Sequence, residues 1–175
     1  MSERLPITAT CGIDRLHERH LAALQILASD PAIAARTRVP HPYPPDGARA
    51  FYAAMQQERQ AGTAHVFAIE NHGQFVGVCG FHGIQRGVAE FGFWVGRPHW
   101  RLGIGGHAAA AAVRVAFDYL QLEALWAEAL ADNVASRRIL AKVGFREVGQ
   151  RQHANANWSA NVPLVRYQLE RPATR

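Results

Sequence analysis

The feature that most constrains the fold is a run of three strand-like segments joined by two short turns. Apolar and polar residues alternate over Thr63–Glu70, the pattern returns over Phe75–Ile84, and an aromatic-rich segment covers Val88–Val95. Asn71–Gln74 and Gln85–Gly87 supply the turn residues between these segments;. Alternation of this kind predicts half-buried strands, and turns this short join antiparallel neighbours. The middle of the chain is therefore expected to form an antiparallel meander.

The segments on either side of the meander switch between helix and strand patterns. Before it, we expect a strand over Leu5–Cys11 and helices over 14–35 and 46–61, joined by the proline-rich connector Pro40–Pro45;. After it, we expect helices over Gly103–Leu120 and Asn133–Val143, and strands over Leu122–Leu130, Gly144–Gly149 and Val162–Leu169;. The expected order is β-α-α-β-β-β-α-β-α-β-β. This order predicts a mixed α/β fold, with a mostly antiparallel sheet of about seven strands and four helices.

Length and composition fit a single domain over residues 1–175. The chain has 175 residues, of which 49% are hydrophobic and 19% charged, enough for one hydrophobic core;. Cys11 and Cys79 are its two cysteines, which excludes a disulfide scaffold and favours a reducing compartment;. The start carries Glu3 and lacks the apolar core of a secretory signal, and the most apolar stretch, Ala108–Phe117, is too short to span a bilayer;. We therefore expect a cytoplasmic protein without a membrane segment.

The charge is positive, with 19 Lys+Arg against 14 Asp+Glu and a formal net charge of +5. A positive field attracts an anionic partner, such as a phosphate-bearing cofactor or a nucleic acid. The sequence has neither the aromatic motif of an RNA-binding sheet nor a dense basic helix;. A nucleic acid is therefore the less favoured of the two partners.

The densest functional signal is Trp100-Arg-Leu-Gly-Ile-Gly-Gly106, between a strand pattern and a helix pattern. Its glycines let the backbone turn sharply and approach a ligand closely. The helix start that follows presents free N–H groups and the positive end of its dipole. Such a site suits a phosphate or pyrophosphate, and a plain glycine-rich turn is the structural alternative.

Two other phosphate-binding motifs were tested against the spacing of this segment. The P-loop string is absent from the sequence;. Gly103, Gly105 and Ala108 match the dinucleotide spacing G-x-G-x-x-A, and Glu123 follows about 20 residues later;. However, Glu123 begins a predicted strand instead of ending one, and antiparallel hairpins precede the glycines. A dinucleotide-binding fold is therefore disfavoured.

A second polar cluster, Asn133-Val-Ala-Ser136, opens the next helix pattern, which runs on to Lys142-Val-Gly-Phe145. Asn133 and Ser136 are three residues apart and so share one side of a helix, just after a strand. Either both face a ligand there, or one of the two, Asn133 or Ser136, simply caps the start of the helix.

Together the two clusters resemble the GNAT superfamily of acetyl-CoA-dependent N-acetyltransferases, and within it the ribosomal-protein-alanine N-acetyltransferase branch. The resemblance also takes in Pro40–Tyr43 and Glu90-Phe-Gly-Phe-Trp94, and so covers nearly the whole chain. It implies transfer of acetyl from acetyl-CoA to a primary amine by direct attack in a ternary complex. The amine is either a protein N-terminal α-amine or a small-molecule amine, no metal is needed, and homodimers are common in the branch. The alternative is a non-catalytic module that binds CoA or nucleic acid.

The resemblance also implies which residues bind CoA. Val95 would pair its backbone with the pantetheine arm, and an N–H near it would bind the oxyanion. Asn133 and Ser136 would lie near the pantetheine and the thiol, whereas Arg138 and Lys142 either lie near the 3′-phosphate or are simply solvated. The backbone amides implied for the pyrophosphate belong to Arg101, Leu102, Gly103, Ile104, Gly105 and Gly106.

Two side chains are implied in catalysis. Many GNAT enzymes place a tyrosine, the acid for the departing thiolate, four residues before the Gly-Phe pair, but this sequence has Leu140 there. The hydroxyl of Ser136 is expected to take that role. Glu90 is the candidate base, because several family members carry a catalytic glutamate in this strand. We expect it to be buried among Val88, Phe91 and Phe93, which would raise the pKa of its carboxyl, unless strand alternation turns it to the surface.

The acceptor amine is expected beside the first interhelical connector and the last loop, which border that side in the family. The polar segment Gln150–Asn161 is expected to form a loop over this site. It lacks the acidic residue common in the branch before the last strand, which weakens the case for a ribosomal-protein substrate. The candidate acceptor residues, each of which also fits a structural role, are His41, Tyr43, His82, His99 and Trp158.

Overall fold

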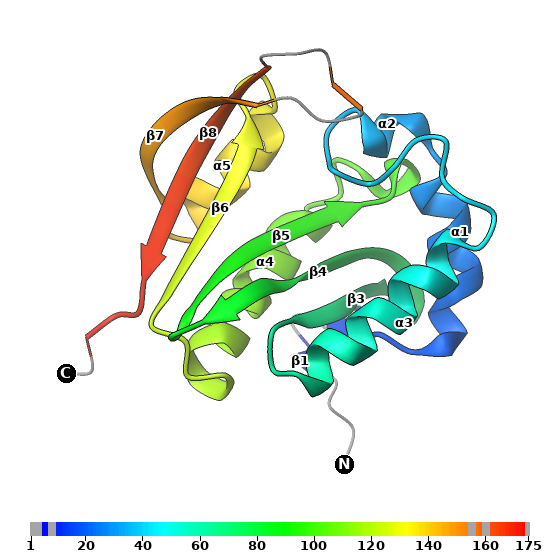
Figure 1. The fold of residues 1–175 in the computed structure, drawn as a ribbon, viewed down its shortest axis with the longest axis horizontal. Coiled ribbons are helices and arrows are strands. Elements are labelled where there is room, and N and C mark those ends of the chain that lie inside the picture. The colour runs from blue at the N-terminus through cyan, green and yellow to red at the C-terminus, as the bar shows by residue number, and fades with distance from the viewer. Residues whose placement is uncertain (1–4, 7–9, 154–156, 159–161, 174–175) are drawn as a thin grey trace.

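A computed structural model describes residues 5–6, 10–153, 157–158 and 162–173. These residues form an eight-stranded sheet in the order β1-β2-β3-β4-β5-β6-β8-β7 (Figure 1). Every neighbouring pair is antiparallel except β5–β6, which is parallel. The strands are β1 (Leu5–Pro6), β2 (Cys11–Arg15), β3 (His65–Asn71), β4 (Gln74–Gln85), β5 (Val88–Val95), β6 (Ala124–Leu130), β7 (Arg146–His153) and β8 (Val162–Glu170).

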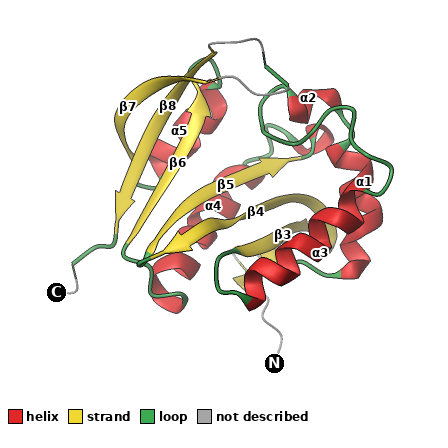
Figure 2. Cartoon of the chain, in the orientation of Figure 1, coloured by secondary structure: helices red, strands yellow, loops and turns green. Residues whose placement is uncertain are grey.

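Helices cover the two faces of the sheet unequally (Figure 2). One face, here called the α3 face, is covered by α1 and α3 over the β3–β5 region, while α4 and α5 lie behind the sheet on the α4 face (Figure 1). The helices are α1 (Leu21–Ala28), α2 (Pro31–Ala34), α3 (Gly47–Gln60), α4 (Ile104–Arg114) and α5 (Val134–Lys142), with short turns η1 (Glu18–His20), η2 (Arg97–His99) and η3 (Val115–Tyr119). No helix of the described residues is long and apolar enough to cross a membrane.

Strand alternation divides the core into two layers, one on each face. On the α4 face, Phe81 and Phe91 pack against the alanine run of α4, whose Ala108 and Ala112 are completely buried. These small side chains let α4 lie close to the sheet. On the α3 face, Leu24 of α1 belongs to the second layer. The meander β3–β4–β5 is thus fixed from both sides.

The structure confirms the mixed α/β class and the meander, and it corrects the boundaries around them. Of the strand expected over Leu5–Cys11, residues 5–6 form β1, Cys11 begins β2, and 7–9 lie outside the described residues. Asp14 and Arg15, expected to begin the first helix, instead end β2, because they pair with Ala68 and Phe67 of β3. The expected helix over 14–35 is divided, since the side chain of Asp30 caps a new helix that begins at Pro31;. The short strand expected over Gly144–Gly149 instead runs from Arg146 to His153.

The parallel pair β5–β6 is short, and the two strands then diverge (Figure 1). Their paired residues are Val88–Ala124, Ala89–Leu125 and Glu90–Trp126. Beyond this point β5 still pairs with β4 as far as Val95, and β6 still pairs with β8 as far as Leu130. We call the point where Glu90 and Trp126 face each other the vertex of the divergence.

Candidate functional site

Beyond the vertex, one edge of β5 carries peptide groups that no described strand pairs. The Gly96 N–H donates to the Val76 carbonyl of β4 at 2.8 Å, so this peptide group points toward β4. Because backbone groups alternate along a strand, the Val95 N–H points the other way, toward the diverging β6. The Val95 carbonyl, on the same side, accepts the indole N–H of Trp100 at 2.5 Å. The N–H of Val95 therefore remains for the predicted pairing with an extended ligand.

The N-terminus of α4 lies beside this edge. A Cβ placed on Gly105 would come 3.1 Å from Ile139 of α5 and 3.6 Å from the Phe93 ring of β5. Only a residue without a side chain lets α4, α5 and β5 approach each other so closely. The glycine-rich segment therefore has a packing role as well as the predicted ligand-binding one.

The amides at the start of α4 are open to a ligand. The helix begins after Gly103, whose positive φ of 76° is a left-handed conformation, and no side chain of the described residues caps it. A Cβ on Gly106 would meet nothing within 4 Å. Free N–H groups, the helix dipole and open space together suit a phosphate group. The geometry thus agrees with the anion-binding interpretation of this segment.

The start of α5 agrees with the capping interpretation of Asn133. Its side-chain oxygen accepts the backbone N–H of Ser136 at 3.2 Å. The Ser136 hydroxyl makes no hydrogen bond within the described chain and stays available to a ligand. Leu140, one turn further along, is only 1% exposed and belongs to the core. Arg138 and Lys142 are exposed on the same helix, so their predicted place near a 3′-phosphate stays a prediction.

Glu90 lies at the vertex, on the α3 face. His82, Glu90 and Trp126 are register partners across β4, β5 and β6, so their side chains share this face;. The Glu90 side chain is 14% exposed and forms an ion pair with Arg38, which follows α2. Glu90 is therefore partly buried, as its role requires.

The prediction that two phenylalanines surround Glu90 is wrong. Phe91 and Phe93 stack on each other with ring centroids 5.6 Å apart, and Phe91 also stacks on Phe145. These rings belong to the α4 side of the sheet, because residues 90 and 91 alternate between faces;. On its own face Glu90 has the predicted Val88, with His82 and Trp126 across the neighbouring strands and Arg38 as its ion-pair partner.

Further charged residues line the α3 face beyond the vertex. Glu128 of β6 accepts two hydrogen bonds from Arg151 of β7, at 2.7 and 2.6 Å, and its side chain is 6% exposed. Hydrogen bonding to Arg151 lowers the pKa of the Glu128 carboxyl. Arg166 of β8 lies 4.3 Å above the ring of Trp126, a cation–π contact;.

These charged residues were not among the sequence candidates. The alternation of Trp126 and Glu128 with Leu125, Ala127 and Ala129 carried a signal of a polar strand face;. The pairing of Arg38 with Glu90 joins residues 52 apart in the chain, and no local pattern indicates it.

The predicted acceptor residues are dispersed. His82 lies beside Glu90, and burial lowers its pKa, which favours the neutral imidazole. The ring of Tyr43 packs against Gly47, a structural contact, and burial raises the pKa of its hydroxyl. His41 is exposed, and His99 belongs to η2, on the segment that leads to α4. Only His82 among these four joins the charged face.

The connector between α2 and α3 is attached to the far half of the sheet. Trp158 donates its indole N–H to the Ala34 carbonyl at 3.3 Å, and its ring contacts that of His153. Arg36 forms an ion pair of 2.7 Å with Asp132, just after β6. Of the loop predicted over Gln150–Asn161, residues 150–153 belong to β7, whereas 154–156 and 159–161 lie outside the described residues.

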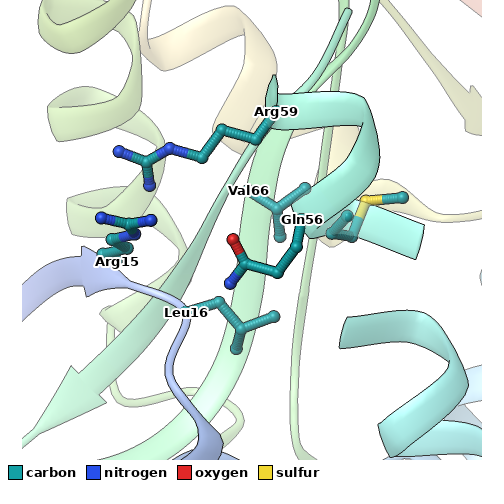
Figure 3. A pocket seen from close by; sticks show the side chains of 6 residues that line it. Arg15, Leu16, Gln56, Arg59 and Val66 are labelled. Atoms are coloured by element: carbon teal, nitrogen blue, oxygen red, sulfur yellow. The ribbon is translucent and has the colours of Figure 1, made fainter. Parts of the chain in front are cut away.

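A separate small recess lies between the end of β2, α3 and β3, away from the vertex (Figure 3). Its volume of about 10 Å³ holds roughly one water molecule;. It is too small for a cofactor or substrate. The residues that line it are Arg15, Leu16, Met55, Gln56, Arg59 and Val66. Within the described part of the chain, no group of three or more His, Cys, Asp or Glu side chains could hold a metal ion.

A mixed sheet that opens between its one parallel pair, with an uncapped glycine-rich helix start beside the opening, is the architecture of CoA-dependent acyltransferases. A family model described as the acetyltransferase (GNAT) domain matches residues 12–146, most of the chain. The chain belongs to this family, which confirms the resemblance found in the sequence.

Known proteins similar to this chain are N-acetyltransferases. The chain is 31% identical over 100 residues to the N-acetyltransferase YoaA of Bacillus subtilis (strain 168), an alignment that covers 56% of each protein. It thus spans about half the length of the curated relatives it matches.

Among solved structures, RimL, a ribosomal L7/L12 α-N-protein acetyltransferase in complex with CoA, aligns with a TM-score of 0.84 at 18% identity, over 97% of this chain and 98% of that one. A spermidine N-acetyltransferase from Vibrio cholerae in complex with CoA and spermine aligns with a TM-score of 0.81 at 15% identity, over 94% and 97%. These likenesses support the fold.

Proposed function

We propose that the protein transfers acetyl from acetyl-CoA to a primary amine, by direct attack within a ternary complex. The observation that carries the proposal is the junction of the open β5 edge with the uncapped N-terminus of α4, on a sheet whose other face carries Glu90 at the vertex. One face thus suits the cofactor and the other suits the acceptor. Membership of the acetyltransferase family supports the same reaction.

The residues present fit CoA. The amides of Ile104, Gly105 and Gly106 would hold its pyrophosphate, and the Val95 N–H would bind either the pantetheine arm or the oxygen that becomes negative during acyl transfer. Arg101 and Leu102 precede the αL residue Gly103 and would contribute further backbone contacts. When bound, acetyl-CoA supplies an acetyl group activated as a thioester.

Glu90 and Ser136 have separate tasks in this proposal. Glu90 accepts the proton that the acceptor amine loses, directly or through one water. Ser136, with its hydroxyl uncommitted, donates a hydrogen bond to the leaving sulfur.

A thermal melt with acetyl-CoA, CoA, NAD and no ligand tests the cofactor. A ligand at about 100 times its Kd adds roughly 2.7 kcal/mol to the free energy of unfolding, which raises the Tm by a few degrees. We expect acetyl-CoA and CoA to raise the Tm and NAD to leave it unchanged. A shift with NAD alone would indicate the dinucleotide site that the glycine spacing also matched.

Gly106→Asp sharpens this test. Because Gly106 has open space around its Cβ position, the variant should fold, and a carboxylate near the start of α4 favours the helix;. The same carboxylate repels pyrophosphate, so the Tm shift with CoA should disappear. Gly106→Asn, of the same shape without the charge, is the matched control and should keep most of the shift.

An amine panel with detection of the released CoA thiol then tests catalysis. Acetylation of at least one primary amine is expected, and binding of acetyl-CoA without transfer to any amine would instead favour the non-catalytic alternative.

A cytoplasmic location and a homodimer, expected from the sequence, belong to the same proposal. Sedimentation would measure the assembly.

A further inference from the structure

The α3 face beyond the vertex carries three arginines that the proposed reaction does not use. Arg38, Arg151 and Arg166, together called the arginine patch, lie over β5, β7 and β8. The covering helices α1 and α3 stop short of β6, β8 and β7 on this face (Figure 1). The patch is therefore exposed beside the place where the acceptor is expected.

Each arginine of the patch contacts a carboxylate and is also partly exposed to solvent. Arg38 contacts Glu90, whereas Arg151 and Arg166 both lie beside Glu128, at 2.6 and 3.8 Å. The three arginine side chains nevertheless remain 61%, 44% and 46% exposed, respectively. A guanidinium carries five N–H donors, so each keeps donors directed to solvent.

The guanidinium groups of this face are exposed, whereas the carboxylates that pair with them are largely buried. The side chains of Glu90 and Glu128 are only 14% and 6% exposed. Burial lowers the pKa of the nearby His82 imidazole, and Glu58 of α3 also acts on it. The patch therefore presents mainly N–H donors to solvent, and such donors bind anions.

Resting on the proposed function, we propose that the acceptor is a peptide α-amine followed by acidic residues, whose carboxylates bind the arginine patch. Arginine binds carboxylates through paired N–H donors, which gives direction as well as attraction. An α-amine, with an ordinary pKa near 8, also loses its proton more readily than a lysine-type amine near 10.4.

The extent of the patch favours a peptide over a free amino acid. Arg38 contacts Glu90 on β5, at the vertex, whereas Arg151 and Arg166 lie beside Glu128, two residues beyond the vertex on β6. One strand spacing and two residues of rise separate these two positions, about 8 Å. Two acidic side chains of one peptide can therefore contact both positions at once.

Three amidated pentapeptides with the same N-terminal serine and acidic, neutral or basic second and third residues test the proposal. Spermidine and free glutamate complete the panel. We measure kcat/KM at saturating acetyl-CoA and, in parallel, the Kd of each acceptor for the CoA-bound protein. The acidic peptide should exceed the basic one by about tenfold in both quantities, and should also exceed spermidine and free glutamate.

Arg38→Gln and Arg166→Gln should each reduce the preference for the acidic peptide to about threefold or less. Arg114→Gln is the matched control, since Arg114 is exposed on α4, behind the sheet, and its loss should leave the preference unchanged. Arg151 is not substituted, because its loss would leave the buried carboxylate of Glu128 without its ion-pair partner.

The outcomes separate the two proposals. Equal kinetics and equal Kd values for the three peptides, or a preference for spermidine, would overturn the acidic acceptor and leave acetyl transfer standing. Tighter binding of the acidic peptide without acetylation of any acceptor would overturn acetyl transfer and support the patch. A higher kcat/KM for free glutamate than for any peptide would overturn the peptide acceptor. It would support only the binding of a carboxylate by the patch.

Discussion

The two halves of the sheet, β2–β5 before the divergence and β6, β8 and β7 after it, are stabilised in different ways. The first half is packed on both faces, and Ala68, Cys79 and Phe81 within it are completely buried. In the second half helices cover one face only, and seven of the eight residues of β7 are exposed. On its other face, the ion pairs of Glu128 lie beside the paired and buried Leu130 and Leu164.

This difference matches the division of labour that we propose. A packed half holds the β5 edge rigidly, which an extended cofactor arm requires. An open half keeps charged side chains in contact with water, where they remain free to bind an acceptor. The experiments below test the comparison, starting with the largest expected effect.

Phe81→Ala removes a completely buried ring from the packed half. Deleting a core aromatic costs about 3–5 kcal/mol, from lost burial and the cavity left behind. Trp126→Ala, in the open half, should cost less than about 2 kcal/mol, since its ring is half-exposed and covered only by Arg166 on that face;. Urea unfolding of both variants measures the difference, and equal losses would contradict the distinction between the halves.

Glu90→Gln removes the proposed base at the border of the two halves. Loss of a general base lowers kcat by about 10²- to 10³-fold. The Tm shift with acetyl-CoA should be unchanged, because the cofactor contacts that we propose lie on the other face. A kcat within about threefold of the parent enzyme would exclude the role, since proton transfer contributes far more than that.

Ser136→Ala should lower kcat by about tenfold, the effect of one hydrogen bond to the leaving group. Its hydroxyl has no partner in the described chain, and Asn133 binds the backbone N–H, which the variant keeps. Stability and acetyl-CoA affinity should therefore stay the same. An unchanged kcat would leave the serine without a catalytic role.

The packed half should also lose stability to acid first. Its buried His20 contacts Glu70 at 3.1 Å, and burial lowers the pKa of the imidazole. At acid pH, His20 binds a proton in the unfolded chain more readily than in the folded chain. The free energy of unfolding therefore falls as the pH drops below about 6.5. In the open half, the pKa of Glu128 is lowered by Arg151, so its contribution is complete above pH of about 4.3 and is lost only below that value;.

Urea unfolding between pH 7 and 3.5 separates these two steps. His20→Gln should flatten the curve between pH 7 and about 5.5, whereas Glu128→Gln should change its slope only below about pH 5. The same slope in all three proteins above pH 5.5 would refute the assignment to His20.

The meander was predictable because both turns and the alternation are local signals. The start of the first helix was predicted too early, since Asp14 and Arg15 belong to a strand only through their pairing with β3, far along the chain. The break at Asp30-Pro31 did carry a local signal, an N-cap before a first-turn proline;. The extension of β7 to His153 depends on pairing with β8, which the polar sequence does not indicate.

In the candidate site, too, features with local sequence signals were predicted and features that depend on distant residues were not. The glycine-rich helix start and the Asn133 cap follow from neighbours in sequence, and the structure has both. The surroundings of Glu90 depend on which face its side chain takes and on an arginine from a distant connector. Sequence alone therefore indicated the residue but gave its environment wrongly.

The connector between α2 and α3 has a mechanical consequence. β5 and β6 meet at one end, while contacts of Arg36 with Asp132 and of Trp158 with Ala34 bridge the two halves at the other. The opening between β5 and β6 is thus bounded at both ends, by strand pairing at the vertex and by side-chain contacts at the far end. The sites that we propose for cofactor and acceptor would share this bounded opening.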